Sequence, residues 1–171
     1  DIHWLTPKDM SSETVTSTID HVSYQALTET PLKHLPENCV AFVFRSNILR
    51  RKLPIAIIQP RVTLNQDMRA LVTHNDISAN YVAEVCLAQQ DLLRSRFVRT
   101  DGSMAAVESK ALFNHEIPVP SPRKQEQIAD QLAAFRSIYT DLTSSLPTEI
   151  EARRKQYEHY RDRLLTFPEK N

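Results

Sequence analysis

The chain has 171 residues, 41% of them hydrophobic, and its 21 basic residues are balanced by 21 acidic ones. A chain of this size can bury one core and is small for two, and its neutral total means that any electrostatic argument for nucleic-acid binding must come from a local patch. Its single glycine, Gly102, excludes the serial-glycine loops that cradle nucleotide phosphates.

The cysteines and histidines show no pattern typical of a metal or redox site. Cys39 and Cys86 lie far apart without a CxxC spacing, and the six histidines are scattered along the chain. No apolar run approaches the roughly 20 residues of a membrane span. We therefore expect two inert buried thiols in a reducing cytoplasm, no metal, no cofactor and no membrane contact. The absence of an initiator Met favours a fragment of a longer protein.

The N-terminal half predicts short strands joined by polar turns. Residues 1–10 indicate a strand that runs into a polar turn, 11–20 a surface loop rich in Ser and Thr, and 21–27 either a strand or one helical turn. After a turn signal at 36–38, the apolar runs at 39–44 and 53–58 predict two buried strands. Pro54 then belongs at a strand start or on an edge strand.

A cluster of cations separates these two apolar runs and continues beyond them. From Phe42 to Arg69 the chain carries a local excess of five positive charges, formed by Arg45, Arg50, Arg51, Lys52, Arg61 and Arg69 against Asp67. The overall neutrality hides this basic patch, which is typical of a surface that binds a polyanion. The alternative is an ordinary solvated hairpin loop.

The run LNQDMRAL at 64–71 sets amides and an arginine among apolar residues. Amide and guanidinium groups have the paired donors and acceptors that match adenine and guanine edges in a major groove, which makes Gln66 and Arg69 candidates for base contacts. The alternative is a local turn or helix cap, since Asn65 and Asp67 favour both.

The middle of the chain predicts a helix followed by a second basic edge. The apolar spacing over 76–93 suits one helix capped by Asp76 or Ser78, whose role is to fill the core. If the next segment is a strand, Arg94, Arg96 and Arg99 lie mostly on one side of it. It leads into a turn that Gly102 makes easy, and 105–112 forms a short helix or strand.

The last third of the chain predicts two amphipathic helices. Apolar residues recur every three or four positions from Ile128 to Leu146, Pro147 interrupts the pattern, and a capping box of Thr148 and Glu151 opens a second helix that ends near residue 167. Helices of about 20 residues are roughly 30 Å long. Their apolar stripes need a further partner, unless they fold as a hairpin onto their own domain.

Catalytic chemistry is poorly supported. Asp101, Glu108 and Lys110 imitate the carboxylates and lysine that hold a metal in one class of nucleases, but the spacing is short and no supporting acid is evident. No serine or cysteine has a recognisable base partner. We expect no catalytic residue.

Several runs follow one another in an order typical of one protein family. They are DIHWLTPKDM at 1–10, FVFRSNILRRKLPIAI at 42–57, LNQDMRAL at 64–71, DGSM at 101–104, EIPVPSPRKQEQIADQL at 116–132 and LPTEIEARRKQYEHYRDRLLTF at 146–167. With these runs the chain resembles, over essentially its whole length, the DNA specificity subunit of type I restriction-modification enzymes. The two C-terminal runs are the most specific.

The resemblance implies an α+β fold in two parts. Residues 1–120 would form a mixed, β-rich target recognition domain that reads one half of a bipartite site on double-stranded DNA. Residues 121–171 would form two long amphipathic helices, a coiled-coil spacer that packs with matching helices of a second copy or of a missing half. The spacer would also dock the methyltransferase subunit and, through it, the restriction subunit. The protein itself would be noncatalytic.

The resemblance also suggests functional positions. The DNA-binding set is Arg45, Ser46, Arg50, Arg51, Lys52, Gln66, Asp67, Arg69, Gly102 and Ser103, with Thr6, Lys8 and Asp9 as a weaker group. Within this set we expect Arg50, Arg51 and Lys52 to hold phosphates, and Arg45, Gln66 and Arg69 to face base edges. The helix-pairing set is Leu132, Phe135, Ile138, Leu142, Ile150, Tyr157 and Leu164.

Some features depart from the family pattern. Asn47 stands where relatives often carry glycine, which asparagine can replace in a left-handed backbone, and DGSM replaces a more usual Gly-Ser-Thr run. A full subunit has two recognition domains and two helical regions, so this chain is either a C-terminal half or a half-length subunit. A helical interaction adaptor with little DNA binding remains the alternative function, ahead of a metal-dependent nuclease.

Overall fold

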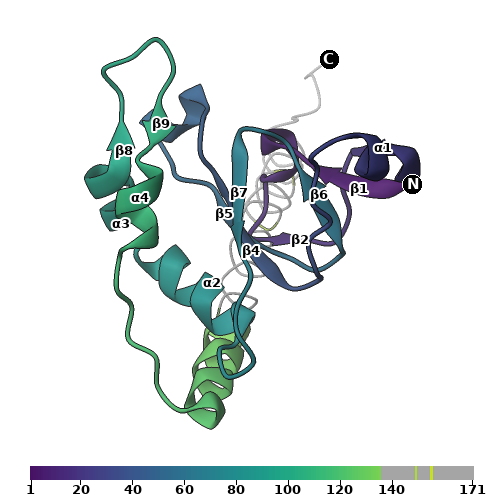
Figure 1. Ribbon diagram of the computed structural model, residues 1–171. Helices are drawn as coiled ribbons and strands as arrows, with labels where there is room; N and C mark the ends of the chain where they lie inside the picture. Colours follow the sequence, from purple (N-terminus) through teal and green to yellow (C-terminus); the bar gives the residue numbers. More distant parts are fainter. Residues whose placement is uncertain (136–148, 150–154, 156–171) are drawn as a thin grey trace, which may run out of the picture. The chain divides into compact units, whose positions relative to one another are not determined.

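The computed structural model describes residues 1–135 together with 149 and 155. The chain divides into two compact units, residues 1–129 and 130–171, and the fold described below is that of the first. It mixes short strands and short helices, as an α+β protein does, and it places three sheets around one apolar core (Figure 1). The α+β class predicted from the sequence is confirmed for this unit.

The first sheet has three strands. Strand β1 (Ile2–Leu5) lies between β3 (Asp20–Val22), which is antiparallel to it, and β6 (Val62–Leu64), which is parallel. The strand and polar turn predicted at 1–10 are both present, because β1 runs into the 3-10 helix η1 (Pro7–Asp9). Since β1 and β6 are parallel, the turns that follow them lie at the same edge of the sheet.

The second sheet forms the centre of the core. Its order is β2 (Thr14–Val15), β5 (Ile55–Ile58), β4 (Cys39–Val43) and β7 (Met68–Leu71). Every residue of β4 and β5 is buried, which explains their continuous apolar runs without polar alternation. Both predicted buried strands are confirmed, and Pro54 comes directly before β5 at a strand start.

The helices flank these sheets, and two of the four labelled α-helices begin at a side-chain cap. Helix α1 (Tyr24–Glu29) is capped by Ser23 and α2 (Ala79–Ala88) by Ser78, and α2 packs against β4 and β5. After α2 come α3 (Gln90–Phe97), the hairpin of β8 (Val98–Arg99) and β9 (Ala106–Val107), and α4 (Ser109–Phe113). The 3-10 helix η2 (Asn47–Arg50) occupies the basic loop between β4 and β5.

Three sequence predictions about local structure were wrong. Residues 11–20 are not all loop, since they contain β2 and the start of β3. The helix predicted over 76–93 is divided at Gln89 into α2 and α3. Arg94 and Arg96 lie on α3 and only Arg99 lies on a strand, so the three arginines do not share one strand face. For 21–27 and for 105–112 the structure contains both a strand and a helix.

The expected glycine-dependent turns were also wrong. Among the described residues only Asn38 has a positive φ, of 59°, in the turn predicted at 36–38. Gly102 has no left-handed backbone, and a Cβ added there would be 3.5 Å from the Met104 carbonyl oxygen, an ordinary contact. Asn47 therefore has no left-handed position to fill, and Gly102 is not required by its turn.

The C-terminal region is described only where it begins. Residues 122–135 are helical, and within the first unit Gln125 and Ala129 of this helix are buried. Leu132 and Phe135 are exposed at the start of the second unit. The remaining predicted pairing positions lie outside the described residues; they are Ile138, Leu142, Ile150, Tyr157 and Leu164. The predicted capping box of Thr148 and Glu151 lies outside them as well. Within the described part of the chain, no helix combines the length and apolar character needed to cross a membrane.

Candidate nucleic-acid interface

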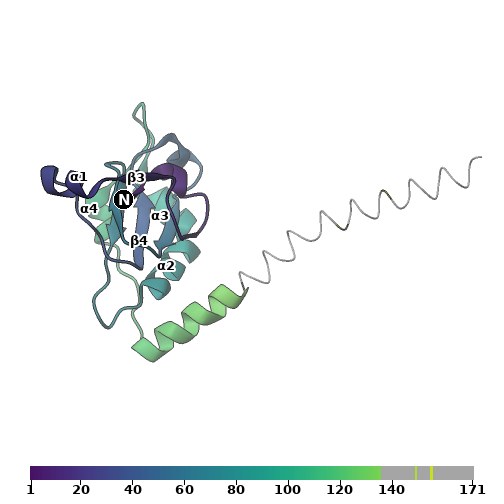
Figure 2. The same cartoon turned by 90° about the vertical axis from the view of Figure 1, so that its right-hand side faces the viewer.

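Four segments converge at one end of the first unit. The Leu5 carbonyl accepts a hydrogen bond from the Asn65 amide at 2.9 Å, so the turns after β1 and β6 adjoin. The end of β4 lies beside the start of β7 through the pair Val43 and Met68, and the Ser46 amide donates to the Ala105 carbonyl at 3.1 Å. We call this surface the loop end, formed by residues 6–10, 44–52, 65–69 and 99–105. It lies at the top of both views (Figures 1 and 2).

Arg45 and Asp67 form an ion pair at the centre of the loop end. The Arg45 Nε lies 2.7 Å from the Asp67 Oδ1, and the two side chains are 54% and 25% exposed. Asp67 is itself held by a turn in which its amide donates to the Asn65 side chain at 2.9 Å. The turn predicted as the alternative for this run is therefore present, and it positions a carboxylate against an arginine.

Arg50 connects η2 to the β8–β9 hairpin. Its Nη1 donates to the Thr100 carbonyl and its Nη2 to the Gly102 carbonyl, both at 2.9 Å. From α3, the Arg94 Nη1 donates to the carbonyl of Arg50 itself at 3.2 Å. Both ends of the Arg50 guanidinium fork are thus occupied by backbone of the neighbouring loop.

Arg69 lies over an aromatic ring and is held by two backbone carbonyls. Its Nη1 donates to the carbonyls of Gln66 at 2.9 Å and Met68 at 2.7 Å, and its guanidinium lies 5.9 Å from the ring centroid of Phe44. Phe44 is stacked on Phe113, with ring centroids 5.4 Å apart. Arg69 is therefore oriented by two carbonyls and a cation–π contact while it remains exposed.

Arg51 and Lys52 differ from these three arginines. Both are exposed, and among the described residues their side chains have no hydrogen-bond or ion-pair partner. Arg61, which the sequence grouped with them, precedes β6 and so lies at the opposite end of the sheet from the loop end. The basic patch at the loop end therefore excludes Arg61.

The weaker group of candidates forms a local cap. The Asp9 Oδ2 accepts hydrogen bonds from the amide and the hydroxyl of Thr6, both at 2.8 Å, and the Thr6 Oγ1 accepts from the Lys8 amide at 3.3 Å. Thr6 is buried, whereas Lys8 is exposed. This capping box shapes η1 beside the 65–69 turn, and it leaves the Lys8 side chain as the cation that this segment presents.

The tip of the hairpin presents Gly102 and Ser103 to solvent. Met104 beside them is 47% exposed. At the base of the hairpin, Arg99 Nη2 forms an ion pair with Glu108 Oε1 at 2.7 Å. Glu108 is thereby engaged, and no group of three His, Cys, Asp or Glu side chains within the described residues is arranged to hold a metal ion.

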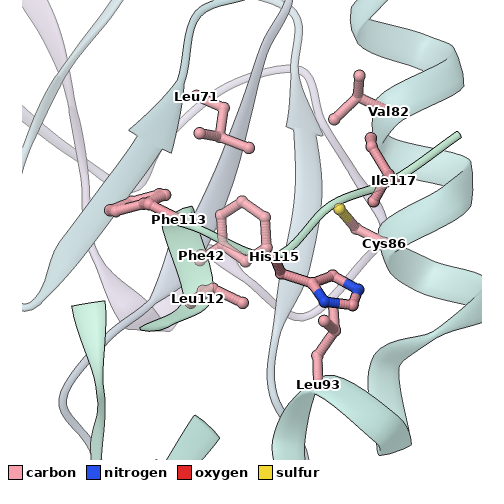
Figure 3. Close-up of a pocket in the computed structure, with 9 residues that line it drawn as sticks. All are labelled: Phe42, Leu71, Val82, Cys86, Leu93, Leu112, Phe113, His115 and Ile117. Carbon is pink, nitrogen blue, oxygen red and sulfur yellow. The ribbon is translucent and has the colours of Figure 1, made fainter. Parts of the chain in front are cut away.

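An apolar cavity of about 80 Å³ lies between the second sheet and helices α2 to α4 (Figure 3). The His115 Nε2 donates to the Gln89 side-chain oxygen at 3.0 Å, and burial raises the pKa of the Cys86 thiol to about 11. Burial also raises the pKa of Cys39 to about 11. Both thiols are buried and protonated at neutral pH, as expected from their sequence context. The lining is Phe42, Leu71, Val82, Cys86, Leu93, Leu112, Phe113, His115 and Ile117.

Sequence reasoning missed the parts that position the loop end. Phe44, Phe113 and Arg94 were not among the candidate residues, although they support Arg69 and Arg50. The position of Phe44 in the sequence could have identified it, because an aromatic residue directly at the end of a buried strand lies beside the first residue of the loop. Phe113 and Arg94 come from distant segments, and no local pattern links them to the loop end.

Comparisons with known proteins identify the family of this chain. The family model for the type I restriction modification DNA specificity domain matches residues 1–152, and the chain belongs to this family. The chain is 41% identical, over 168 residues, to the EcoR124I/EcoR124II type I restriction enzyme specificity subunit of Escherichia coli. That match covers 98% of the chain and 41% of the relative.

Two further comparisons agree. A putative type I specificity subunit of Mycoplasma pneumoniae, S.MpnORF289P C-terminus, is 38% identical over 79 residues, which are 46% of the chain and 54% of the relative. A chain from a solved structure of a type I R-M system has a TM-score of 0.68 at 16% identity, covering 92% of this chain and 36% of that one. The resemblance to type I specificity subunits predicted from the sequence is confirmed. The chain spans about two fifths of the length of the E. coli relative.

Proposed function

We propose that this chain is a sequence-reading part of a type I restriction-modification specificity subunit, and that its loop end reads one half of a bipartite site on double-stranded DNA. The observation that carries the proposal is the convergence of the loops at 44–52, 65–69 and 99–105 on one end of a buried sheet, where they present the exposed cations Arg45, Arg51, Lys52 and Arg69. Exposed guanidinium and amide groups on a rigid support match what base and phosphate recognition requires.

The contacts of each cation suggest a division of roles. Arg51 and Lys52, whose side chains have no partner among the described residues, are suited to neutralise phosphates, and Lys8 adds a third charge at the rim. Arg45, Gln66 and Arg69 are suited to face base edges. Arg50, which we first expected to hold a phosphate, is better suited to position the hairpin because both ends of its fork are engaged.

We further propose that residues 1–120 read DNA and that residues 121–171 form the helical spacer. The spacer would join this chain to a second recognition domain, or to a second copy, and would dock the methyltransferase subunit and through it the restriction subunit. Exposed Leu132 and Phe135, at the start of this region, are compatible with such pairing. The chain itself would carry no catalytic residue.

Selection of bound DNA from a random duplex library tests this function. The full chain is used at moderate salt, alone and with a modification subunit of the same system. We expect enrichment of a short motif of about three to five base pairs, or of an inverted pair at fixed spacing if two copies assemble. No enrichment in either condition would overturn the proposal and would favour a helical adaptor that binds only protein.

A further inference from the structure

Arg45 has a fixed backbone and a fixed guanidinium plane, and its terminal nitrogens have no partner among the described residues. On one side its amide donates to the Asp67 carbonyl at 3.3 Å, and on the other it forms a β-bridge with Ala106 of the hairpin. It directly follows Phe44, whose amide and carbonyl are also paired, with Asp67 and Val107 respectively. The backbone that carries the Arg45 side chain is therefore held between two of the converging loops.

The side chain of Arg45 is oriented as well. Its Nε is bonded to the Asp67 carboxylate, so the guanidinium plane is set by a partner that is itself held in a turn. Among the described residues no group accepts a hydrogen bond from the terminal nitrogens Nη1 and Nη2. Within the described residues the guanidinium therefore presents its two terminal NH2 groups as an unoccupied and oriented pair, on a side chain that is more than half exposed.

Two DNA groups accept such a pair of donors, a phosphate and the O6 and N7 edge of guanine. The adjacent Asp67 carboxylate decides between them, because a phosphate brought to Arg45 would meet a second negative charge, whereas a base edge is neutral. A carboxylate that fixes an arginine also restricts it to one plane, which suits a single base edge. For phosphates the same loop offers Arg51 and Lys52, whose side chains have no partner in the described part of the chain.

We propose that Arg45, held by Asp67, reads one guanine of the DNA half-site through a bidentate contact to O6 and N7. This rests on the proposed function and deepens it, since it assigns one base and the residue that reads it. Asp67 is then a positioning residue, which acts on the base through Arg45.

The test compares selections by the full chain and its variants under the conditions given above. In the wild type we expect a motif that contains the guanine. Arg45→Ala should remove the preference for guanine at that position, by about tenfold to a hundredfold, and leave the other positions unchanged. Arg45→Lys keeps the charge but loses the planar fork, so it should preserve a phosphate contact and weaken the preference for guanine. Asp67→Asn should weaken the same position less than Arg45→Ala does.

A modified base gives an independent readout. In 7-deazaguanine the N7 acceptor is replaced by carbon, while Watson–Crick pairing is retained. At the assigned position it should weaken binding of the wild type about tenfold, since a charged hydrogen bond is lost, and should leave Arg45→Ala unchanged within about twofold. Circular dichroism of each variant checks that the domain is folded.

Three results would overturn the inference, and they are distinguishable. If the wild type selects a motif and Arg45→Ala retains every position at lower affinity, Arg45 binds a phosphate and only this inference fails. If Arg45→Lys also keeps the full guanine preference, the bidentate contact is excluded. If the wild type selects no motif, the proposed function fails first and the inference fails with it.

Discussion

Two regions of the first unit are each tied together by one side chain that bonds to distant backbone. At the loop end, exposed Arg50 bonds to the carbonyls of Thr100 and Gly102. At the opposite end, Gln125 is only 1% exposed, and its Oε1 accepts a hydrogen bond from the Ser78 amide at 2.8 Å. Its Nε2 donates to the Asp76 carbonyl at 3.1 Å and to the Pro120 carbonyl at 2.8 Å.

The difference lies in what replaces each side chain when it is lost. Around Arg50, water can solvate the freed carbonyls. Loss of the Arg50 side chain should therefore change the position of the hairpin more than the free energy of unfolding. Around Gln125, which is itself buried, three backbone groups lose their partner at a partly buried site, where an unsatisfied polar group costs about 1–3 kcal/mol. Similar hydrogen bonds therefore hold the fold together in one region and set the positions of loops in the other.

The largest effect is expected for Gln125→Ala. We predict a loss of about 3 kcal/mol in the free energy of unfolding, because a buried side chain is lost and partly buried backbone groups of the α2 cap and of the 115–121 segment lose their partner. Urea unfolding of the full chain, followed by the fluorescence of Trp4, reports on this unit because Trp4 is the single tryptophan. Exposed Gln127→Ala on the same helix is the matched control. Equal effects from the two substitutions would contradict the role given to burial.

A smaller change in stability is expected for Arg50→Ala. The freed carbonyls are hydrated, so the free energy of unfolding should fall by less than about 1 kcal/mol. The hairpin tip loses its support, and the amides of 100–105 should exchange hydrogen several-fold faster. Arg51→Ala, which removes a neighbouring arginine without a partner among the described residues, should leave this exchange rate unchanged. Unaltered exchange in Arg50→Ala would show that the hairpin holds its position alone.

The smallest structural effect, and a purely electrostatic one, is expected for Arg51→Ala. Stability should not change, while affinity should fall for all DNA sequences alike and the slope of log affinity against log salt should decrease by roughly one unit. Fluorescence anisotropy over a series of salt concentrations measures this. Arg61→Ala, at the other end of the sheet, should leave the slope as it is. A slope that stays the same in Arg51→Ala would remove Arg51 from the phosphate contacts.

Much of the core was predictable because burial on both faces leaves an unmistakable apolar run. This holds for β4 and β5, and for the basic loop that separates them. The break between α2 and α3 was not predictable, since no Gly or Pro marks Gln89. There the side chains of Gln89 and Gln90 bond to His115 and to the Leu53 carbonyl, which are tertiary contacts without a local signature.

One missed element had a usable signal. The alternation in 94–99 indicated a strand, yet Leu93 and Phe97 are four residues apart and both are buried, which is the spacing of a helix face. For the candidate site, the sequence predicted which cations lie near the loop end but not their roles. The engagement of Arg50 depends on carbonyls 50 and 52 positions further along the chain, which only the folded structure brings to it.

The backbone of the hairpin tip does not require particular residues, and this has a practical consequence for engineering. Gly102 adopts no conformation reserved for glycine and has room for a Cβ. The hairpin is supported by Arg50 and by the pairing of β8 with β9, and neither involves the side chains of the tip. Residues 101–104 can therefore be randomised as a library without disturbing the fold. New sequence preferences can then be selected by display on a scaffold that remains constant.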